Sequence, residues 1–86
     1  MSDKVYAIWT LDHMESGAPH LHGIYSKIER ARISLKAMAE IDAEFNEDYT
    51  LLWGGPDRYY ILADPDDDRS TLEETYIEAE DFDKVL

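Results

Sequence analysis

The chain has 86 residues, no cysteine and a formal net charge of -12. It is therefore the size of one domain, and disulfides, thiolate nucleophiles and cysteine-ligated zinc are excluded. A hydrophobic content of 44% is too high for a disordered chain. No apolar run approaches the ~20 residues of a membrane span, and the opening residues lack the basic start of a secretory signal. We expect one folded, cytoplasmic domain over residues 1–86.

The negative charge is unevenly distributed along the chain. Residues 1–36 carry five Lys/Arg against four Asp/Glu, a net charge of +1, whereas residues 37–86 carry three Lys/Arg against sixteen Asp/Glu, a net charge of -13. Such a surface repels nucleic acid and anionic membranes, and it attracts basic proteins over roughly a Debye length of 8 to 10 Å. The composition therefore indicates a basic protein as the partner.

The first quarter of the chain has the pattern of a hairpin with a long loop. Residues 4–12 alternate between two faces, one of which is made of Val5, Ala7, Trp9 and Leu11. This alternation predicts a strand with neighbours on both sides. Gly17 and Pro19 indicate a loop, and residues 20–25 form the second predicted strand.

Residues 26–45 are the stretch with helical periodicity. Ser26 and Glu29 have the spacing of a capping box at the start of this helix. One stripe of the helix is apolar and should lie against a sheet, and it consists of Ile28, Ala31, Leu35, Met38 and Ala39. Asp42 interrupts the stripe, so we expect the helix to end within three residues of Ala43.

The second half of the chain contains three predicted strands. Residues 49–53 and 58–63 are apolar and aromatic, and the glycine-rich turn between them predicts a second hairpin. Residues 64–69 (DPDDDR) oppose strand formation and should form a solvated loop. Residues 71–81 alternate apolar and acidic positions, which is typical of a strand with one face in water.

These elements predict an α+β fold in the order β-β-α-β-β-β. One helix packs on a mostly antiparallel sheet of four to five strands. The side chains expected to form the core are Trp9, Leu11, Ile28, Leu35, Met38 and Ile61.

Residues 23–31 (GIYSKIERA) resemble the strand-to-helix junction of small phage and bacterial proteins of unassigned activity. Residues 4–7 (KVYA) and 73–78 (EETYIE) are similar to the first strand and the acidic final strand of those proteins, so the resemblance covers about half the chain. Residues 53–57 and 64–69 have no counterpart. The resemblance implies a fold and a phage context, and it carries over no activity and no functional residue.

Metal binding and catalysis have few candidate residues. His20 and His22 share one face of a strand, and His13 or Asp12 is positioned in the sequence to complete a metal site; solvated histidines are the simpler interpretation. The aspartates of residues 64–68 follow the spacing of a calcium loop, but Arg69 and Thr75 replace its glycine and glutamate. Because the sequence also lacks the nucleophile, phosphate-loop and zinc motifs of common enzymes, we expect neither catalysis nor a cofactor.

A second apolar row on the helix faces away from the predicted core and consists of Ile33, Ala37 and Ile41. Isolated surface aliphatics are common, but a row on a thin domain indicates self-association. The sequence therefore predicts a homodimer formed through this row or through an unpaired sheet edge.

The acidic final strand is the second candidate for a binding surface. Glu74, Glu78 and Glu80 lie on one face with a repeat of ~6.7 Å, about twice the spacing of phosphates along a DNA strand. Arg58 and Arg69 could neutralise this face by pairing within it. The full set of expected partner-binding residues is Asp66, Asp67, Asp68, Glu73, Glu74, Glu78, Glu80 and Asp81.

These observations favour a non-enzymatic acidic inhibitor, encoded by a phage, that imitates nucleic-acid charge and blocks a nucleic-acid-binding protein in the host cytoplasm. Two alternatives remain open. One is a small oligomeric accessory domain whose acidity provides only solubility. The other is a metal- or ligand-binding module that uses the histidines.

Overall fold

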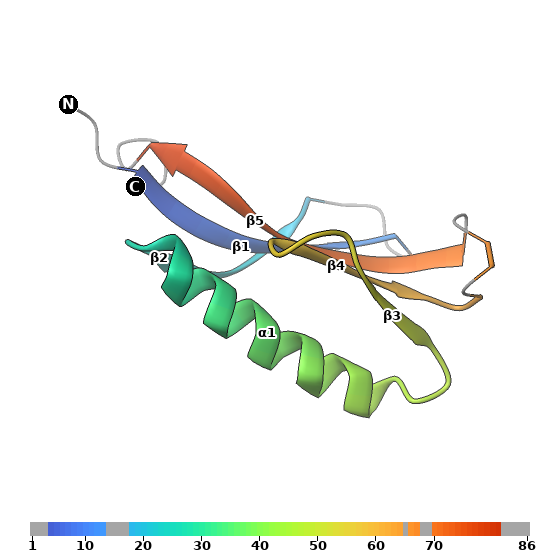
Figure 1. Ribbon diagram of the computed structural model, residues 1–86. Coiled ribbons are helices and arrows are strands. Elements are labelled where there is room, and N and C mark those ends of the chain that lie inside the picture. The colour runs from blue at the N-terminus through green and yellow to red at the C-terminus, as the bar shows by residue number, and fades with distance from the viewer. Residues whose placement is uncertain (1–3, 14–17, 65, 68–69, 82–86) are drawn as a thin grey trace.

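The computed structural model of the chain describes residues 4–13, 18–64, 66–67 and 70–81. Its elements in sequence order are β1 (Lys4–Asp12), β2 (His20–Tyr25), α1 (Ile28–Phe45), β3 (Thr50–Trp53), β4 (Arg58–Leu62) and β5 (Thr71–Asp81). The strands form one antiparallel sheet in the order β2-β1-β5-β4-β3. The predicted α+β fold and its element order are confirmed (Figure 1).

Both predicted hairpins are present, because β1 pairs with β2 and β3 pairs with β4. The β3–β4 turn contains Gly55 with a φ of 117°, a backbone conformation that glycine adopts without steric cost. The last strand in the sequence, β5, pairs with both β1 and β4 and is the middle strand of the sheet. The most acidic strand is therefore held on both sides.

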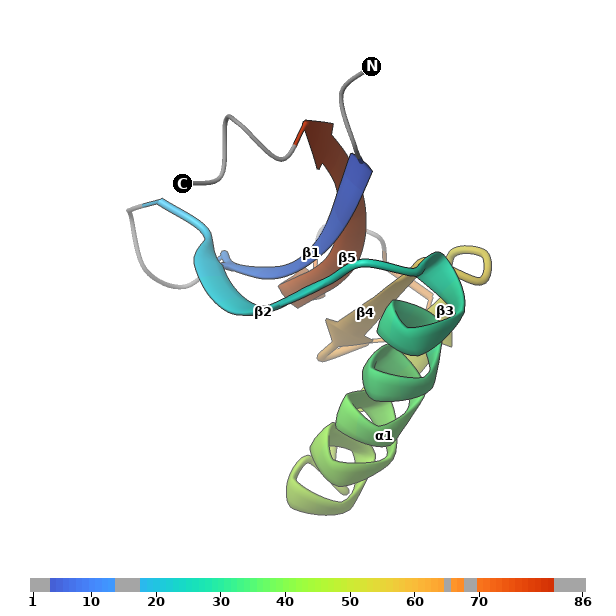
Figure 2. The same cartoon turned by 90° about the vertical axis from the view of Figure 1, so that its left-hand side faces the viewer.

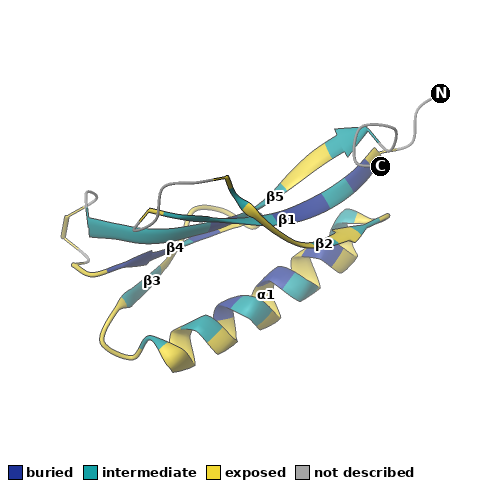
Figure 3. Cartoon of the chain, turned by 180° about the vertical axis from the view of Figure 1, so that it is seen from behind, coloured by how far each residue is buried: buried dark blue, intermediate teal, exposed yellow. Residues whose placement is uncertain are grey.

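Helix α1 lies across one face of the sheet, as Figures 1 and 2 show from two directions. Its buried positions face the strands (Figure 3). The buried cluster between the helix and the sheet consists of Ile8, Leu35, Ala39, Tyr59 and Ile61, with Met38 packed against it. Leu35 and Ile61 are buried as predicted, and Met38 packs against them while partly exposed; Ile28, also expected in the core, is partly exposed and lies outside this cluster.

The inward face of β1 differs from the prediction. Ile8 is 0% exposed and belongs to the core beneath α1. Since neighbouring side chains of a strand point to opposite faces, Trp9 and Leu11 lie on the side of the sheet opposite α1, which we call the open face. The expectation that these two residues pack with Leu35 was wrong. Both faces of β1 are largely apolar, so alternation alone did not show which of them the helix covers.

The start of α1 also differs from the prediction. The N-cap residue is Lys27, and no side chain caps the helix, so the expected capping box of Ser26 and Glu29 was wrong. Strand β2 stays paired with β1 up to Tyr25, whose hydroxyl lies 2.6 Å from that of Ser34. Two residues are then needed for the chain to turn into the helix. The end of α1, at Phe45, falls within the predicted range.

Candidate functional site

Acidic side chains gather at the end of the molecule where β1, β4 and α1 finish and where β3 and β5 begin. The strand register brings these chain segments together, because Asp12 lies opposite Glu73, and Leu62 lies opposite both Thr50 and Thr71. The same end is on the right in Figure 1. We call the following residues the acidic end: Asp12, Asp42, Glu44, Glu47, Asp48, Asp64, Asp66, Asp67 and Glu73.

The basic residues that the structure describes lie away from the acidic end. They occupy the start of β1, the N-cap and first half of α1, and the start of β4. These residues are Lys4, Lys27, Arg30, Arg32, Lys36 and Arg58. Some pair with acids outside the acidic end: Arg32 lies 2.6 Å from Asp57, and Lys4 lies 2.7 Å from Asp81. The charge asymmetry of the sequence thus becomes an asymmetry between two ends of the fold.

The acidic end has an exposed layer and a half-buried layer. Its exposed side chains are Glu44, Glu47, Asp48, Asp64, Asp66 and Asp67. Asp12, Asp42 and Glu73 are only partly exposed. A cavity of about 230 Å³ lies beside the half-buried layer and is lined by Asp12, Asn46, Tyr49, Ile61, Leu72 and Glu73.

Hydrogen bonding and burial shift pKa values in and beside the half-buried layer. The hydroxyl of Tyr59 donates a hydrogen bond to the carboxylate of Asp42. Burial and this bond raise the pKa of Tyr59 well above its usual value. Burial, together with the nearby charges of Asp42 and Asp12, raises the pKa of Glu73. Glu73 is therefore protonated more readily than an ordinary glutamate.

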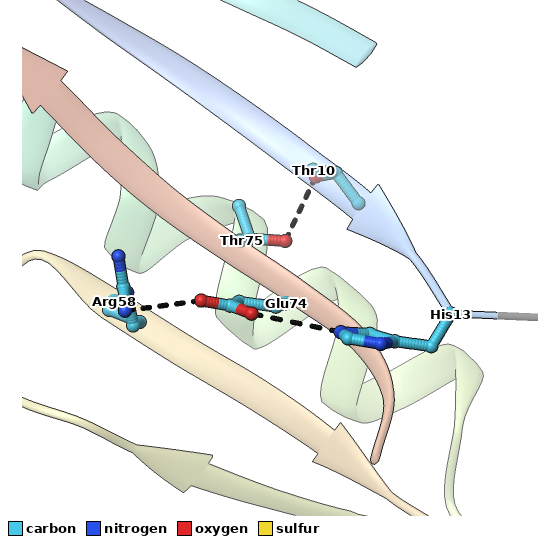
Figure 4. A network of polar contacts seen from close by, with 5 residues as sticks. All are labelled: Thr10, His13, Arg58, Glu74 and Thr75. Atoms are coloured by element: carbon cyan, nitrogen blue, oxygen red, sulfur yellow. Dashed lines mark hydrogen bonds and ion pairs between the residues drawn. The ribbon is translucent and has the colours of Figure 1, made fainter. Parts of the chain in front are cut away.

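The acidic row of β5 lies on the open face, as its alternation predicted, but its charge is partly offset. Glu74 is 3.2 Å from Arg58 and 3.7 Å from His13 (Figure 4). The expected possibility that Arg58 neutralises this face is therefore realised at Glu74, and Arg69, the other residue expected to do so, lies outside the described residues. Glu78 is exposed and Glu80 is half-buried on the same side of the strand.

The structure divides the rest of the predicted partner-binding set among several places. Glu73 points toward the α1 side of the sheet, away from the row of Glu74. Asp81, at the far end of β5, pairs with Lys4. Asp66 and Asp67 are exposed in the β4–β5 turn, and Asp68 lies outside the described residues.

Several members of the acidic end were not among the predicted partner-binding residues. They come from the end of β1, from α1 and the α1–β3 turn, and from the start of the β4–β5 turn: Asp12, Asp42, Glu44, Glu47, Asp48 and Asp64. The sequence contained a signal for the members from α1 and the α1–β3 turn, since no Lys or Arg occurs between Lys36 and Arg58; it contained none for Asp12 or Asp64. Their proximity to Asp66 and Asp67 depends on the sheet order.

His20 and His22 both neighbour Thr10, whereas His13 lies apart from them. Nε2 of His22 lies 2.7 Å from the hydroxyl of Thr10, which in turn lies 2.9 Å from the hydroxyl of Thr75 (Figure 4). His13 is beside Glu74 instead, and His20 is in register with Thr10. Within the described ranges, no group of three His, Asp or Glu side chains is arranged to hold a metal ion.

The predicted self-association row of α1 is exposed. Ile33 and Ile41 are 68% and 53% exposed, and Ala37 between them is also exposed. These side chains point away from the sheet.

The described part of the chain contains no helix with the length and hydrophobicity to cross a bilayer.

No protein-family model, curated protein sequence or solved structure matches the chain significantly. The resemblance of residues 23–31 to phage proteins stays a prediction.

Proposed function

We propose that this protein is a non-enzymatic inhibitor whose acidic end occupies the nucleic-acid site of a basic protein. The observation that supports this proposal is the gathering of acids from β1, α1, β5 and two connecting turns at one end of a single fold, with the described Lys and Arg residues elsewhere. A nucleic-acid-binding protein already presents Lys and Arg arranged for phosphates. Carboxylates held at one end of a fold offer such a groove a substitute for its phosphates.

The fold supports a low ordering cost on binding. Asp42 is fixed by the hydroxyl of Tyr59, and Oδ1 of Asp64 accepts a hydrogen bond of 3.0 Å from the backbone N–H of Asp66. Side chains and loops that are ordered before binding lose less entropy in the complex than a flexible acidic tail. The acidic end therefore gives both attraction and a defined shape.

The setting we propose is the cytoplasm of a bacterial cell infected by a phage. The resemblance of residues 23–31 to phage proteins motivates this setting, and a counter-defence factor that blocks a host nucleic-acid-binding protein fits it. No catalytic residue and no cofactor enter the proposal.

Elution from immobilised DNA tests this function. Bacterial nucleic-acid-binding proteins are loaded on DNA-cellulose and eluted with this protein at two salt concentrations. The comparison is a variant that carries Glu44→Gln, Asp66→Asn and Asp67→Asn. We expect the wild type to release a specific basic protein at low salt, and the variant to release much less. Release that is equal for the two proteins, or that does not weaken as salt rises, would show that the acidic end does not bind.

A further inference from the structure

Strand β3 is an open edge of the sheet. It pairs with β4 on one side, and no described strand lies on its other side (Figure 1). The N–H of Gly54 donates to the carbonyl of Arg58 at 2.9 Å. The backbone N–H and C=O groups of successive residues in a strand point to alternate sides. Because those of Gly54 face β4, those of Trp53 and Leu51 point away from β4. They are available to a further strand.

Large apolar side chains are exposed at this edge. Tyr49, Leu52 and Trp53 are 45%, 50% and 42% exposed. Charged side chains and proline protect natural edge strands from pairing with another strand. Residues 49–53 contain neither. The charged residues nearest in the sequence, Asp48 and Asp57, lie beyond the strand in the two turns.

Hollows flank β3 on both faces of the sheet. On the α1 side, a cavity of about 530 Å³ has an apolar lining of Ala39, Ala43, Leu51, Trp53 and Pro56, together with Arg32, Lys36 and Glu40. On the open face, a cavity of about 310 Å³ is lined by Leu52, Tyr60, Leu62 and Thr71. Side chains of a strand beside β3 alternate between the two faces, so such a strand would fill both hollows.

We propose that β3 of a second copy of this chain occupies this edge, antiparallel to β3 and related to it by a two-fold axis at Leu52. In that register the outward backbone groups of Leu51 pair with those of Trp53 of the second copy, and the reciprocal pair forms across the axis. Leu51 and Trp53 of both copies then fill the space between the two helices. The two Leu52 side chains meet on the open face.

Charge complementarity favours a second copy as the occupant. Arg32 is bound to Asp57 in the β3–β4 turn, so the positive residues of α1 lie near the end of β3, while Glu47 and Asp48 lie before its start. Antiparallel pairing brings Glu47 and Asp48 of each copy toward Arg32 and Lys36 of the other. It also places the two acidic ends at opposite ends of the paired strands, which limits repulsion between two chains of charge -12.

The row of Ile33, Ala37 and Ile41 remains exposed in this dimer. That row offers side chains alone, whereas β3 offers side chains, cavities and open backbone groups. The sequence predicted a homodimer formed either through this row or through an unpaired sheet edge, and the geometry points to the sheet edge. The pairing does not depend on the proposed function.

Disulfide crosslinking tests the register. The chain has no cysteine, so Leu52→Cys introduces a single thiol. Residues opposite each other in a non-hydrogen-bonded antiparallel pair have Cα atoms about 4.5 Å apart, within the range of disulfides. The matched control is Leu21→Cys on the other edge strand, where Leu21 is 46% exposed. With a mild oxidant we expect Leu52→Cys to become mostly a covalent dimer and Leu21→Cys to stay mostly monomeric under denaturing conditions. Equal crosslinking of both, or little at position 52, would overturn the proposal.

Sedimentation tests the interface without a new bond. We expect a wild-type dimer at tens of micromolar, a monomer for Leu52→Lys, and a dimer for Ile33→Glu with Ile41→Glu. Circular dichroism checks that each variant is folded. A monomeric wild type, or a dimer that survives Leu52→Lys but dissociates when the helix row is changed, would contradict pairing through β3.

A variant in which Glu47→Lys and Asp48→Lys are combined keeps β3 intact and should dimerise at least tenfold more weakly. Unchanged association of this variant would also contradict pairing through β3.

Discussion

At the scale of single residues, the interrupted apolar stripe of α1 has a structural cause. Asp42 occupies an inward position of the helix and accepts a hydrogen bond from the buried Tyr59. A buried hydroxyl without a partner would be costly, so the pair satisfies both groups. The sequence identified Asp42 as the exception, but its partner lies in another element and had no local signal.

Removing the hydroxyl of Tyr59 should destabilise the fold. Tyr59→Phe keeps the ring against Trp53, whose centroid lies 5.4 Å away, but leaves Asp42 without this donor. We expect a loss of about 1 to 3 kcal/mol in the free energy of unfolding, measured with urea at neutral pH. The control is Tyr49→Phe, because Tyr49 is 45% exposed, and it should change stability by less than about 0.5 kcal/mol. Equal effects of the two variants would contradict a stabilising role for this bond.

Glu73 should make stability depend on pH. Its folded-state pKa is raised above the ordinary value of 4.5, so the folded state binds its proton more tightly than the unfolded state does. The charged form therefore destabilises the fold above the folded-state pKa, and this penalty is lost as pH falls toward 4.5. We expect Glu73→Gln to raise the melting temperature at pH 7 and to have little effect near pH 4.

The exposed residue Glu78 provides the comparison for that experiment. Glu78→Gln should leave the difference in melting temperature between pH 7 and pH 4 close to that of the wild type. A Glu73→Gln protein that is less stable than wild type at pH 7 would contradict the assigned environment of Glu73.

At the scale of elements, the first and last residues of the strands were predictable, but the elements that pack against them were not. The bounds of β1, β2 and β5 match the sequence prediction, because alternation and turn residues are local signals. The choice of Ile8 over Trp9 as the inward residue depends on which face α1 covers. The start of α1 similarly depends on the pairing of β2 with β1. These features arise from contacts between segments far apart in the sequence.

Truncating the inward stripe of α1 tests the packing of helix on sheet. Leu35 is 0% exposed, so Leu35→Ala should lower the free energy of unfolding by about 2 to 5 kcal/mol. Ile33→Ala on the outward face, where Ile33 is 68% exposed, should change it by about 0.5 kcal/mol or less. A cost below about 0.5 kcal/mol for Leu35→Ala would show that the stripe does not pack on the sheet.

At the scale of the whole molecule, charge is separated along an elongated fold. The longest dimension is 45 Å, several times the ~8 Å Debye length at physiological salt. The acidic end therefore presents its own field, distinct from that of the basic residues of α1. The sequence predicted the excess of acid in the second half of the chain. It did not predict the position of this surface, which requires Asp12 from the first strand and the α1–β3 and β4–β5 turns to come together.

We expect the position of the acids, and not their number, to produce binding. Two variants of equal net charge separate these effects: Glu44→Gln with Asp66→Asn and Asp67→Asn at the acidic end, and Glu74→Gln with Glu78→Gln and Glu80→Gln on β5. The measurement is the association rate with the basic protein released from DNA-cellulose, at low and physiological salt. We expect about a tenfold slower association for the acidic-end variant at low salt and less than about a twofold change for the β5 variant. Equal slowing by both variants, or greater slowing by the β5 variant, would contradict the claim.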